Sequence, residues 1–275
     1  ADKRRELEEQ AQQYEDIAYG LSPDLSQVRF LATPTPGAAN VAEYWAKVDD
    51  VTFSVPHGFY DEAFSLYLSC ATEGAQVRYT LDGSKPTAST GSVYVDGSAI
   101  PITTTTVVRA GAFKSGHDDA TVVSSTYLFL DDVIQQPEDQ SSRGMPSSWG
   151  AYDADYEMDP DIVNDPAYAD VMRDALLAIP TISIVMDNDE LFDSTDGFYT
   201  NSRQRGEEWE RETSVEYFDP NGDMTGFQLN CGIRAHGELA RHPDKNPKRP
   251  LRLLFKGEYG PSKLNYSLFG ETDVS

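Results

Sequence analysis

Apolar and polar residues alternate strictly in parts of this sequence, and this alternation constrains the fold more than any other feature. In Gly226–His236 every second residue is apolar. A period of two places these side chains on one face of a β-strand. Leu251–Phe255 repeats the pattern, and three prolines in His242–Pro250 keep the segment between them from pairing as a central strand. The sequence therefore predicts a strand, a polar loop and a second strand.

Positive charge gathers in this strand–loop–strand segment. Between Arg234 and Lys263 there are eight Lys or Arg residues and three Asp or Glu residues, in a chain with 22 basic and 46 acidic residues. Two interpretations are open. The basic residues either hold an anion, most plausibly a phosphate, or they line the solvated outer face of the strand pair.

Several motifs in this part of the chain resemble the CotH family of spore-coat kinases. They are "IPTISIVMDNDELFD", "GFYTNSRQRGEEWERETSVEYFDPNGD", "GIRAHGELAR…NPKRPLRLLF" and "EYGPSKLNYSLF", in that order within Pro180–Phe269. Members of this family resemble atypical protein kinases that phosphorylate secreted proteins. The resemblance implies a partial α+β kinase-like first lobe in residues 179–275, and ATP and Mg²⁺ as cofactors of the complete parent protein.

The same resemblance implies roles for individual residues. The expected contacts of the nucleotide phosphates are Lys248, Arg249 and Arg234. An acid can pair with the nucleotide-contacting lysine of a kinase-like lobe, and the candidates are Glu210 and Glu216. The alternative for Glu210 is a surface ion pair. The family's catalytic acids lie in a second lobe, so no catalytic residue is expected within this segment.

Short strands at near-regular spacing occupy residues 47–131. Gly, Pro and Asp separate them, which is typical of an antiparallel β-sandwich. The stretch "VRYTLDGSKPTASTGSVY" resembles the chitobiase/β-hexosaminidase C-terminal-like module, an immunoglobulin-like accessory domain, over Phe53–Tyr127. Tyr60, Tyr79 and Tyr94 are candidates for stacking on carbohydrate, and the alternative is that they pack inside the sandwich. We expect a spacer or weak binding module without an active site.

The remaining segments read as connections. Asp2–Tyr14 has the pattern of a charged helix, and a short strand is expected at Val28–Leu31. Residues 1–46 resemble the end of a lamin-tail-like domain, the alternative being a proline-rich linker. Residues 132–178 begin as a polar linker and continue as an acidic stretch. Two helix starts are expected there, at Asp159-Pro160 and Asp165-Pro166.

Five carboxylates surround the turn that follows Thr181–Met186, which by composition is a buried strand. Asp187 and Asp189 supply only the beginning of a calcium-ligand pattern. The alternative to a Ca²⁺ site is a capped short helix at Asn188–Phe192. The residue pattern leaves both interpretations open.

Composition limits the classes of partner. A net charge of −24 argues against nucleic acid and anionic membranes, and no apolar run is long enough to cross a bilayer. Cys70 and Cys231 lie in different expected domains, which favours buried free thiols over a disulfide. Expected partners are other domains of the same parent chain and extracellular proteins or glycans.

The sequence thus predicts a mainly β, multidomain protein that is secreted or at a bacterial cell surface. It would combine an immunoglobulin-like β-sandwich with the kinase-like N-lobe of a CotH-like protein, catalytically incomplete by itself. The alternative is an extracellular structural, adhesion or carbohydrate-binding protein without enzymatic turnover.

Overall fold

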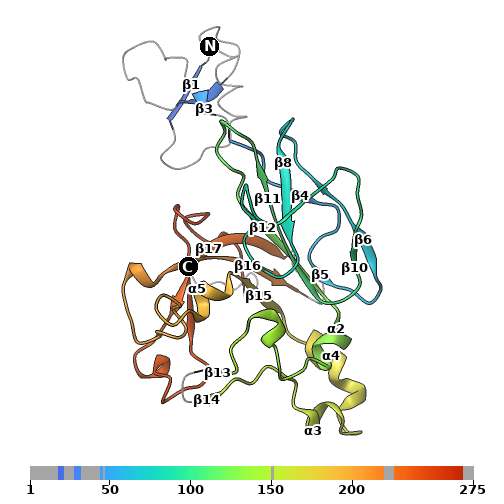
Figure 1. Ribbon diagram of the computed structural model, residues 1–275. Helices are drawn as coiled ribbons and strands as arrows, with labels where there is room; N and C mark the ends of the chain where they lie inside the picture. The colour runs from blue at the N-terminus through green and yellow to red at the C-terminus, as the bar shows by residue number, and fades with distance from the viewer. Residues whose placement is uncertain are drawn as a thin grey trace.

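The computed structural model describes residues 47–149, 152–219 and 226–268, and the backbone of three short strands before them. These strands form an antiparallel sheet in the order β1-β2-β3 (Figure 1). Their bounds are β1 (Ala18–Leu21), β2 (Val28–Leu31) and β3 (Tyr44–Trp45). The strand predicted at Val28–Leu31 is confirmed. The helix predicted at Asp2–Tyr14 lies outside the described residues, as does most of the lamin-tail-like segment.

A β-sandwich follows (Figure 1). Its strands are β4 (Thr52–Phe53), β5 (Gly58–Phe59), β6 (Phe64–Leu66), β7 (Leu68–Ser69), β8 (Gln76–Thr80), β9 (Ser92–Val93), β10 (Ile100–Ile102), β11 (Thr106–Phe113) and β12 (Val123–Leu128). Five of them form one sheet in the order β5-β12-β11-β8-β9, and the pairs β4–β7 and β6–β10 complete the sandwich. The expected β-sandwich is confirmed.

The core of the sandwich explains its alternating sequence. Leu66 and Leu68 are buried, as the period of two requires, and Val108 and Tyr127 are completely buried beside them. Burying one such side chain stabilises the fold by about 1.5–3 kcal/mol. The hydroxyl of Tyr127 is not orphaned, because it donates to the carbonyl oxygen of Val55 at 2.9 Å.

A second sheet of four antiparallel strands follows in chain order, β15-β16-β17-β18. The strands are β15 (Thr181–Val185), β16 (Arg211–Phe218), β17 (Phe227–Ala235) and β18 (Leu251–Leu254). Tyr217 of β16 lies opposite Phe227 of β17, so these two strands pair as antiparallel neighbours. The strand–loop–strand prediction for β17 and β18 is confirmed.

One face of this sheet carries an apolar core. Ile233 and Ala235 of β17 pack with Met186 and Phe198, and Leu253 of β18 joins them. The short helix α5 (Asn188–Phe192) supplies Leu191 to the same core. The helix interpretation of Asn188–Phe192 is therefore confirmed.

The expectation of a buried strand at Thr181–Met186 was wrong for part of that strand. Ile182 and Ile184 are 51% and 39% exposed. The reason is topological: β15 is an edge strand of its sheet, and these two side chains point away from the face that packs on the sandwich. Val185 and Met186 are buried, as expected.

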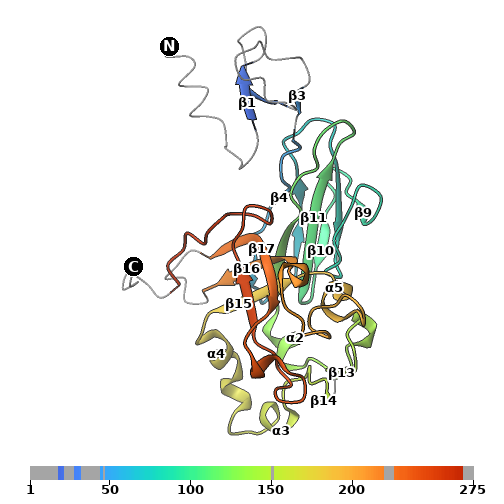
Figure 2. The same cartoon turned by 90° about the vertical axis from the view of Figure 1, so that its left-hand side faces the viewer.

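The linker between the two sheets is folded rather than extended. Its helices are α2 (Leu130–Ile134), α3 (Pro160–Val163) and α4 (Met172–Leu177), and all three lie in the lower half of Figures 1 and 2. The linker also holds the short strands β13 (Ser148–Trp149) and β14 (Tyr152–Asp153). The first half of 132–178, predicted as a polar linker, contains the end of α2, a 3₁₀ turn at Ser141–Arg143 and β13. Arg173 of α4 joins α2 and the sandwich, because its guanidinium binds both Asp131 and Asp61.

The first predicted helix start is confirmed, since Asp159 caps α3 by accepting a hydrogen bond from the Asp161 amide at 2.9 Å. The second helix begins later than predicted. The Asp165 carboxylate instead accepts from the Ala167 amide at 2.8 Å and forms a turn, and a 3₁₀ turn at 169–171 precedes α4. Within the described residues, every helix is too short or too polar to cross a membrane.

Both cysteines are free, as predicted. Cys231 lies on the apolar face of β17 and is completely buried, and this burial raises the pKa of its thiol to about 11. Cys70 is only half-buried, and its Sγ lies 3.2 Å from the carbonyl oxygen of Asp49.

Two glycines fix the contact between β17 and the segment after β18. A Cβ on Gly232 would lie 2.6 Å from the ring of Tyr259, and a Cβ on Gly260 would lie 2.2 Å from the carbonyl oxygen of Asn230. The segment that contains Tyr259 and Gly260 therefore packs directly on β17. Only glycine fits these positions without moving backbone or ring.

We predict that Gly260→Ala destabilises the protein by about 1–3 kcal/mol, because the new methyl group collides with backbone that cannot move independently. Urea denaturation measures the change. Ser262→Ala, at an exposed position of the same loop, is the control and should stay within about 0.5 kcal/mol of the wild type. Equal stability of the two variants would contradict this packing.

Candidate functional site

The structure separates the residues that the sequence grouped as phosphate contacts. Lys248 is 74% exposed, and its Nζ lies 3.9 Å from Asp155. Arg249 is buried, and its guanidinium stacks on the ring of Tyr199 at 4.5 Å. Arg234 belongs to a different group of charges on β17. Of the three residues, only Arg234 lies beside a predicted lysine-pairing acid.

That acid is Glu210, which directly precedes β16 and whose side chain is only 1% exposed. Its carboxylate accepts from Nη1 of Arg234 at 2.8 Å and from Nζ of Lys256 at 2.6 Å. We call these three residues the Glu210 cluster. Hydrogen bonding to Glu210 raises the pKa of Lys256. Glu210 therefore pairs with Lys256 and not with Lys248. Its role as the acid of a kinase-like lobe stays a prediction.

The sheet positions the cluster. Arg234 lies directly opposite Arg252 of β18, and Lys256 follows two residues after β18 ends. Two like charges opposite each other are unfavourable unless an anion lies between or beside them. Glu210 supplies one negative charge for Arg234, while Arg252 is exposed and has no ion-pair partner within the described residues.

Two more acids approach the same lysine. Lys256 Nζ lies 3.2 Å from Glu207 and 3.6 Å from Glu258, both of them exposed. The site thus holds one buried carboxylate and two exposed ones. Lys256 was not among the site residues predicted from the sequence. The alternation that continues beyond Leu254 places it on the same face as Arg252 and was the signal for it.

Glu216, the other candidate acid, makes no ion pair with a lysine in the part of the chain that the structure describes. It lies on β16, is completely buried, and faces β12 of the sandwich. Its carboxylate accepts from Ser124 Oγ at 2.9 Å and from the Thr126 amide at 2.8 Å, and His57 Nδ1 lies 3.3 Å away. Glu216 therefore joins the sandwich to the second sheet.

Further polar contacts extend this junction. Ser124 Oγ lies 2.5 Å from Ser214 Oγ, and Thr126 Oγ1 lies 2.9 Å from Ser183 Oγ. Asn230 of β17 donates to the carbonyl oxygen of Val122 at 3.0 Å. Two sheet faces that look solvent-exposed in sequence are thus buried against each other through hydrogen bonds.

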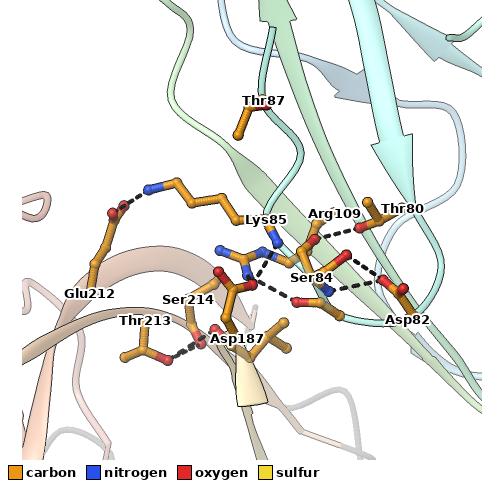
Figure 3. Close-up of polar contacts among 12 residues, drawn as sticks. Thr80, Asp82, Ser84, Lys85, Thr87, Arg109, Asp187, Glu212, Thr213 and Ser214 are labelled. Carbon is orange, nitrogen blue, oxygen red and sulfur yellow. Dashed lines mark hydrogen bonds and ion pairs between the residues drawn. The ribbon is translucent and has the colours of Figure 1, made fainter. Parts of the chain in front are cut away.

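Ion pairs close one edge of the junction (Figure 3). Arg109 of β11 is buried, and its Nη1 donates to Asp187 at 3.0 Å. The backbone amide of Lys85 donates to the same Asp187 oxygen at 2.6 Å, while Lys85 Nζ reaches Glu212 at 2.5 Å. Figure 3 shows both acids on the second sheet side and both cations on the sandwich side.

These contacts bear on the candidate calcium ligands. Asp187 does not cap α5, because its carboxylate binds Arg109 and Lys85 instead. Asp189 is exposed. Burial, reinforced by Asp187, raises the pKa of the neighbouring Glu190. In the described ranges, no three His, Cys, Asp or Glu side chains are grouped so that they could hold a metal ion.

The three candidate tyrosines pack against the sandwich core. The ring centroid of Tyr60 lies 4.6 Å from that of Phe64 and 5.7 Å from that of Tyr127. Tyr79 and Tyr94 contact each other edge to face, with ring centroids 6.3 Å apart. Carbohydrate stacking by these rings stays a prediction.

Comparison with known proteins identifies the sandwich. The family model for the chitobiase/beta-hexosaminidase C-terminal domain matches residues 55–125. The chain therefore contains this immunoglobulin-like module where the sequence predicts it. No curated protein matches the chain, and no solved structure does.

We predict that Ser124 and Glu216 are energetically coupled across the junction. A double-mutant cycle with Ser124→Ala and Glu216→Gln should give a coupling energy of about 1–3 kcal/mol. The reason is that replacing either side chain weakens or removes the hydrogen bond that the buried group of the other one makes. Denaturant unfolding of the four proteins measures it. As a control, Ser124→Ala combined with the exposed Ser262→Ala should be additive. Additivity in the Ser124–Glu216 cycle as well would show that the two sheets do not make this contact in solution.

Proposed function

We propose that this chain is part of a secreted, multidomain CotH-like protein. In this proposal residues 179–275 supply part of a kinase-like first lobe, and the immunoglobulin-like module is its accessory domain. The lobe binds nucleotide phosphates through Lys256 and Arg234, with Glu210 as the acid that holds the lysine. The complete protein uses ATP and Mg²⁺.

The pairing of Lys256 with a buried carboxylate on an antiparallel sheet carries this proposal. A lysine that contacts nucleotide phosphates needs a fixed position, and kinase-like lobes obtain it from a lysine–glutamate ion pair. Glu210 is fixed by burial and by its bond to Arg234, while Lys256 remains 31% exposed. The ammonium group is therefore both held in place and accessible to a phosphate oxygen.

The neighbouring charges fit a phosphate as well. Arg234 is 26% exposed, and Arg252 opposite it is exposed and lacks an ion-pair partner within the described ranges. Guanidinium groups match phosphate oxygens in geometry and charge. Three cationic side chains thus share one face of β17, β18 and the segment after them.

Phosphoryl transfer requires more than this lobe. Mg²⁺ bridges and neutralises the phosphates in kinases, and a carboxylate near the acceptor hydroxyl positions it for transfer. We assign neither role to a residue of this chain. The proposal is that it contributes the phosphate-contacting lysine and its support, and that the remaining catalytic groups belong to other parts of the parent protein.

Calorimetric titration of the full-length protein with ATP and Mg²⁺ tests the proposal. Lys256→Ala should weaken binding at least about tenfold, since a charge-assisted hydrogen bond contributes about 1.5–3 kcal/mol. Lys248→Ala is the matched control and should leave the affinity nearly unchanged, because Lys248 is 74% exposed and outside the Glu210 cluster. Equal losses in the two variants would place the phosphate elsewhere.

A second function is favoured by the charge balance at the same site. Lys256 lies within 3.6 Å of three glutamates, so the group has little net positive charge to offer an anion. This favours an extracellular structural, adhesion or carbohydrate-binding protein in which the lobe is a scaffold without turnover. Absence of ATP binding by the full-length protein would support this alternative over the first.

A further inference from the structure

Three arginine side chains are almost fully buried in the part of the chain that the structure describes: Arg109 is 4% exposed, and Arg241 and Arg249 are each 5% exposed. Arg109 has a carboxylate partner, Asp187. Arg241 and Arg249 have no carboxylate oxygen within 4.0 Å among the described residues, although the chain holds 46 acidic residues. Both lie in the loop between β17 and β18, which we call the basic loop (residues 239–250).

The surroundings of Arg249 are aromatic. Its guanidinium lies over the ring of Tyr199, and its Nη2 donates to the carbonyl oxygen of Trp149 at 3.0 Å. Trp149 in turn packs edge to face on Tyr199 and Tyr156. The remaining nitrogens of Arg249, Nε and Nη1, are buried without a hydrogen-bond partner.

Arg241 is also buried with one guanidinium nitrogen that has no hydrogen-bond partner among the described residues. Its Nη1 donates to the carbonyl oxygen of Gln204 at 3.2 Å, and its Nε is buried without a partner. The backbone carbonyl of Arg241 accepts from Ser202 Oγ at 2.7 Å, while the Arg249 amide reaches the hydroxyl of Tyr199 at 3.3 Å. Both arginines of the basic loop therefore pack on one segment, residues 199–204.

The exposed charges around the loop are also mainly positive. Arg203 and Lys245 share Asp244, at 2.6 Å and 3.9 Å, and Arg203 lowers the pKa of that carboxyl. Lys248 reaches only Asp155, at 3.9 Å. Asp244 and Asp155 are thus already paired with bases on the surface, and among the described residues no carboxylate oxygen lies within 4.0 Å of the buried guanidinium groups.

A buried cation without a partner is costly, because it loses its hydration and gains no compensating charge. Natural folds rarely keep two such groups in one loop unless something else compensates them. We propose that the basic loop is a binding site for a doubly charged tetrahedral oxyanion, phosphate or sulfate, centred on Arg249 with Arg241 as its second cation.

The chemistry of the loop supports this class of ligand. Two uncompensated positive charges match a dianion, and the unpartnered N–H groups are donors that need acceptor oxygens. The carbonyl of Trp149 is the one hydrogen-bond acceptor that the described residues give the Arg249 guanidinium. An anion at this site would supply acceptors for Nε and Nη1, which have none among the described residues.

The basic loop is separate from the Glu210 cluster. Tyr199, on which Arg249 stacks, packs in the core that includes Ile233 and Ala235. Arg234 lies between these two residues in β17, so its side chain points to the opposite face of the sheet. The oxyanion site therefore does not depend on the nucleotide proposal.

Thermal unfolding in inorganic phosphate, compared with sodium chloride at equal ionic strength, tests this inference. Phosphate should raise the melting temperature of the wild type by about 2–4 °C more than chloride does. Arg249→Met should abolish this rise and, without phosphate, should be at least as stable as the wild type, because it removes a buried charge. Arg241→Met should reduce the rise, and it provides a second test if Arg249→Met does not fold.

A control variant separates this site from other bases: Lys263→Met should keep the phosphate effect, because Lys263 is an exposed base elsewhere. Sulfate in place of phosphate tests the identity of the anion. An equal effect shows that the site accepts either anion, and a weaker effect assigns it to phosphate. No rise above chloride, or a rise that persists in Arg249→Met and Arg241→Met, would overturn the inference.

Discussion

The buried carboxylate of Glu216 is the constraint on which the arrangement of the two sheets depends. A carboxylate with no solvent exposure is tolerated only when hydrogen bonds replace its lost hydration. Ser124 and Thr126 supply them, and the imidazole of His57 lies 3.3 Å away; all three residues belong to the sandwich module. If one sheet moved against the other, the Glu216 carboxylate would lose its hydrogen-bond donors. We therefore infer that the two modules form one unit with a defined relative orientation.

The strands were predictable from the sequence because the alternation of apolar and polar residues indicates one buried face directly. The burial of the opposite, polar face of β12 and β16 was not predictable. Ser124, Thr126 and Glu216 are polar, and polar residues at alternate positions of a strand normally indicate solvent. The weak signal was that β12 carries Ser and Thr there, without the Lys or Glu of a typical exposed face. The prediction that Ile182 is buried was wrong for the opposite reason, because an apolar residue on an edge strand can stay exposed.

The concentration of positive charge in the basic segment was predictable from the sequence. The separation of its residues onto two faces of the second sheet was not. Composition placed Arg234, Arg249 and Lys256 in one island. In the structure Glu210 gathers Arg234 and Lys256 on one face of the second sheet, and Arg249 stacks on Tyr199 next to the core of the other face. Side-chain direction in a strand decides this separation, and loop geometry decides where Arg249 points. Neither can be derived from charge counts.

Calorimetric unfolding of the chain tests the central claim, that the sandwich and the second sheet are one cooperative unit joined through Glu216. Both should unfold in a single transition, with equal calorimetric and van't Hoff enthalpies for residues 47–268. Glu216→Ala should then lower the temperature of that transition or divide it in two. Two independent transitions in the wild type, neither of them moved by Glu216→Ala, would show that the sandwich and the second sheet are not joined through Glu216.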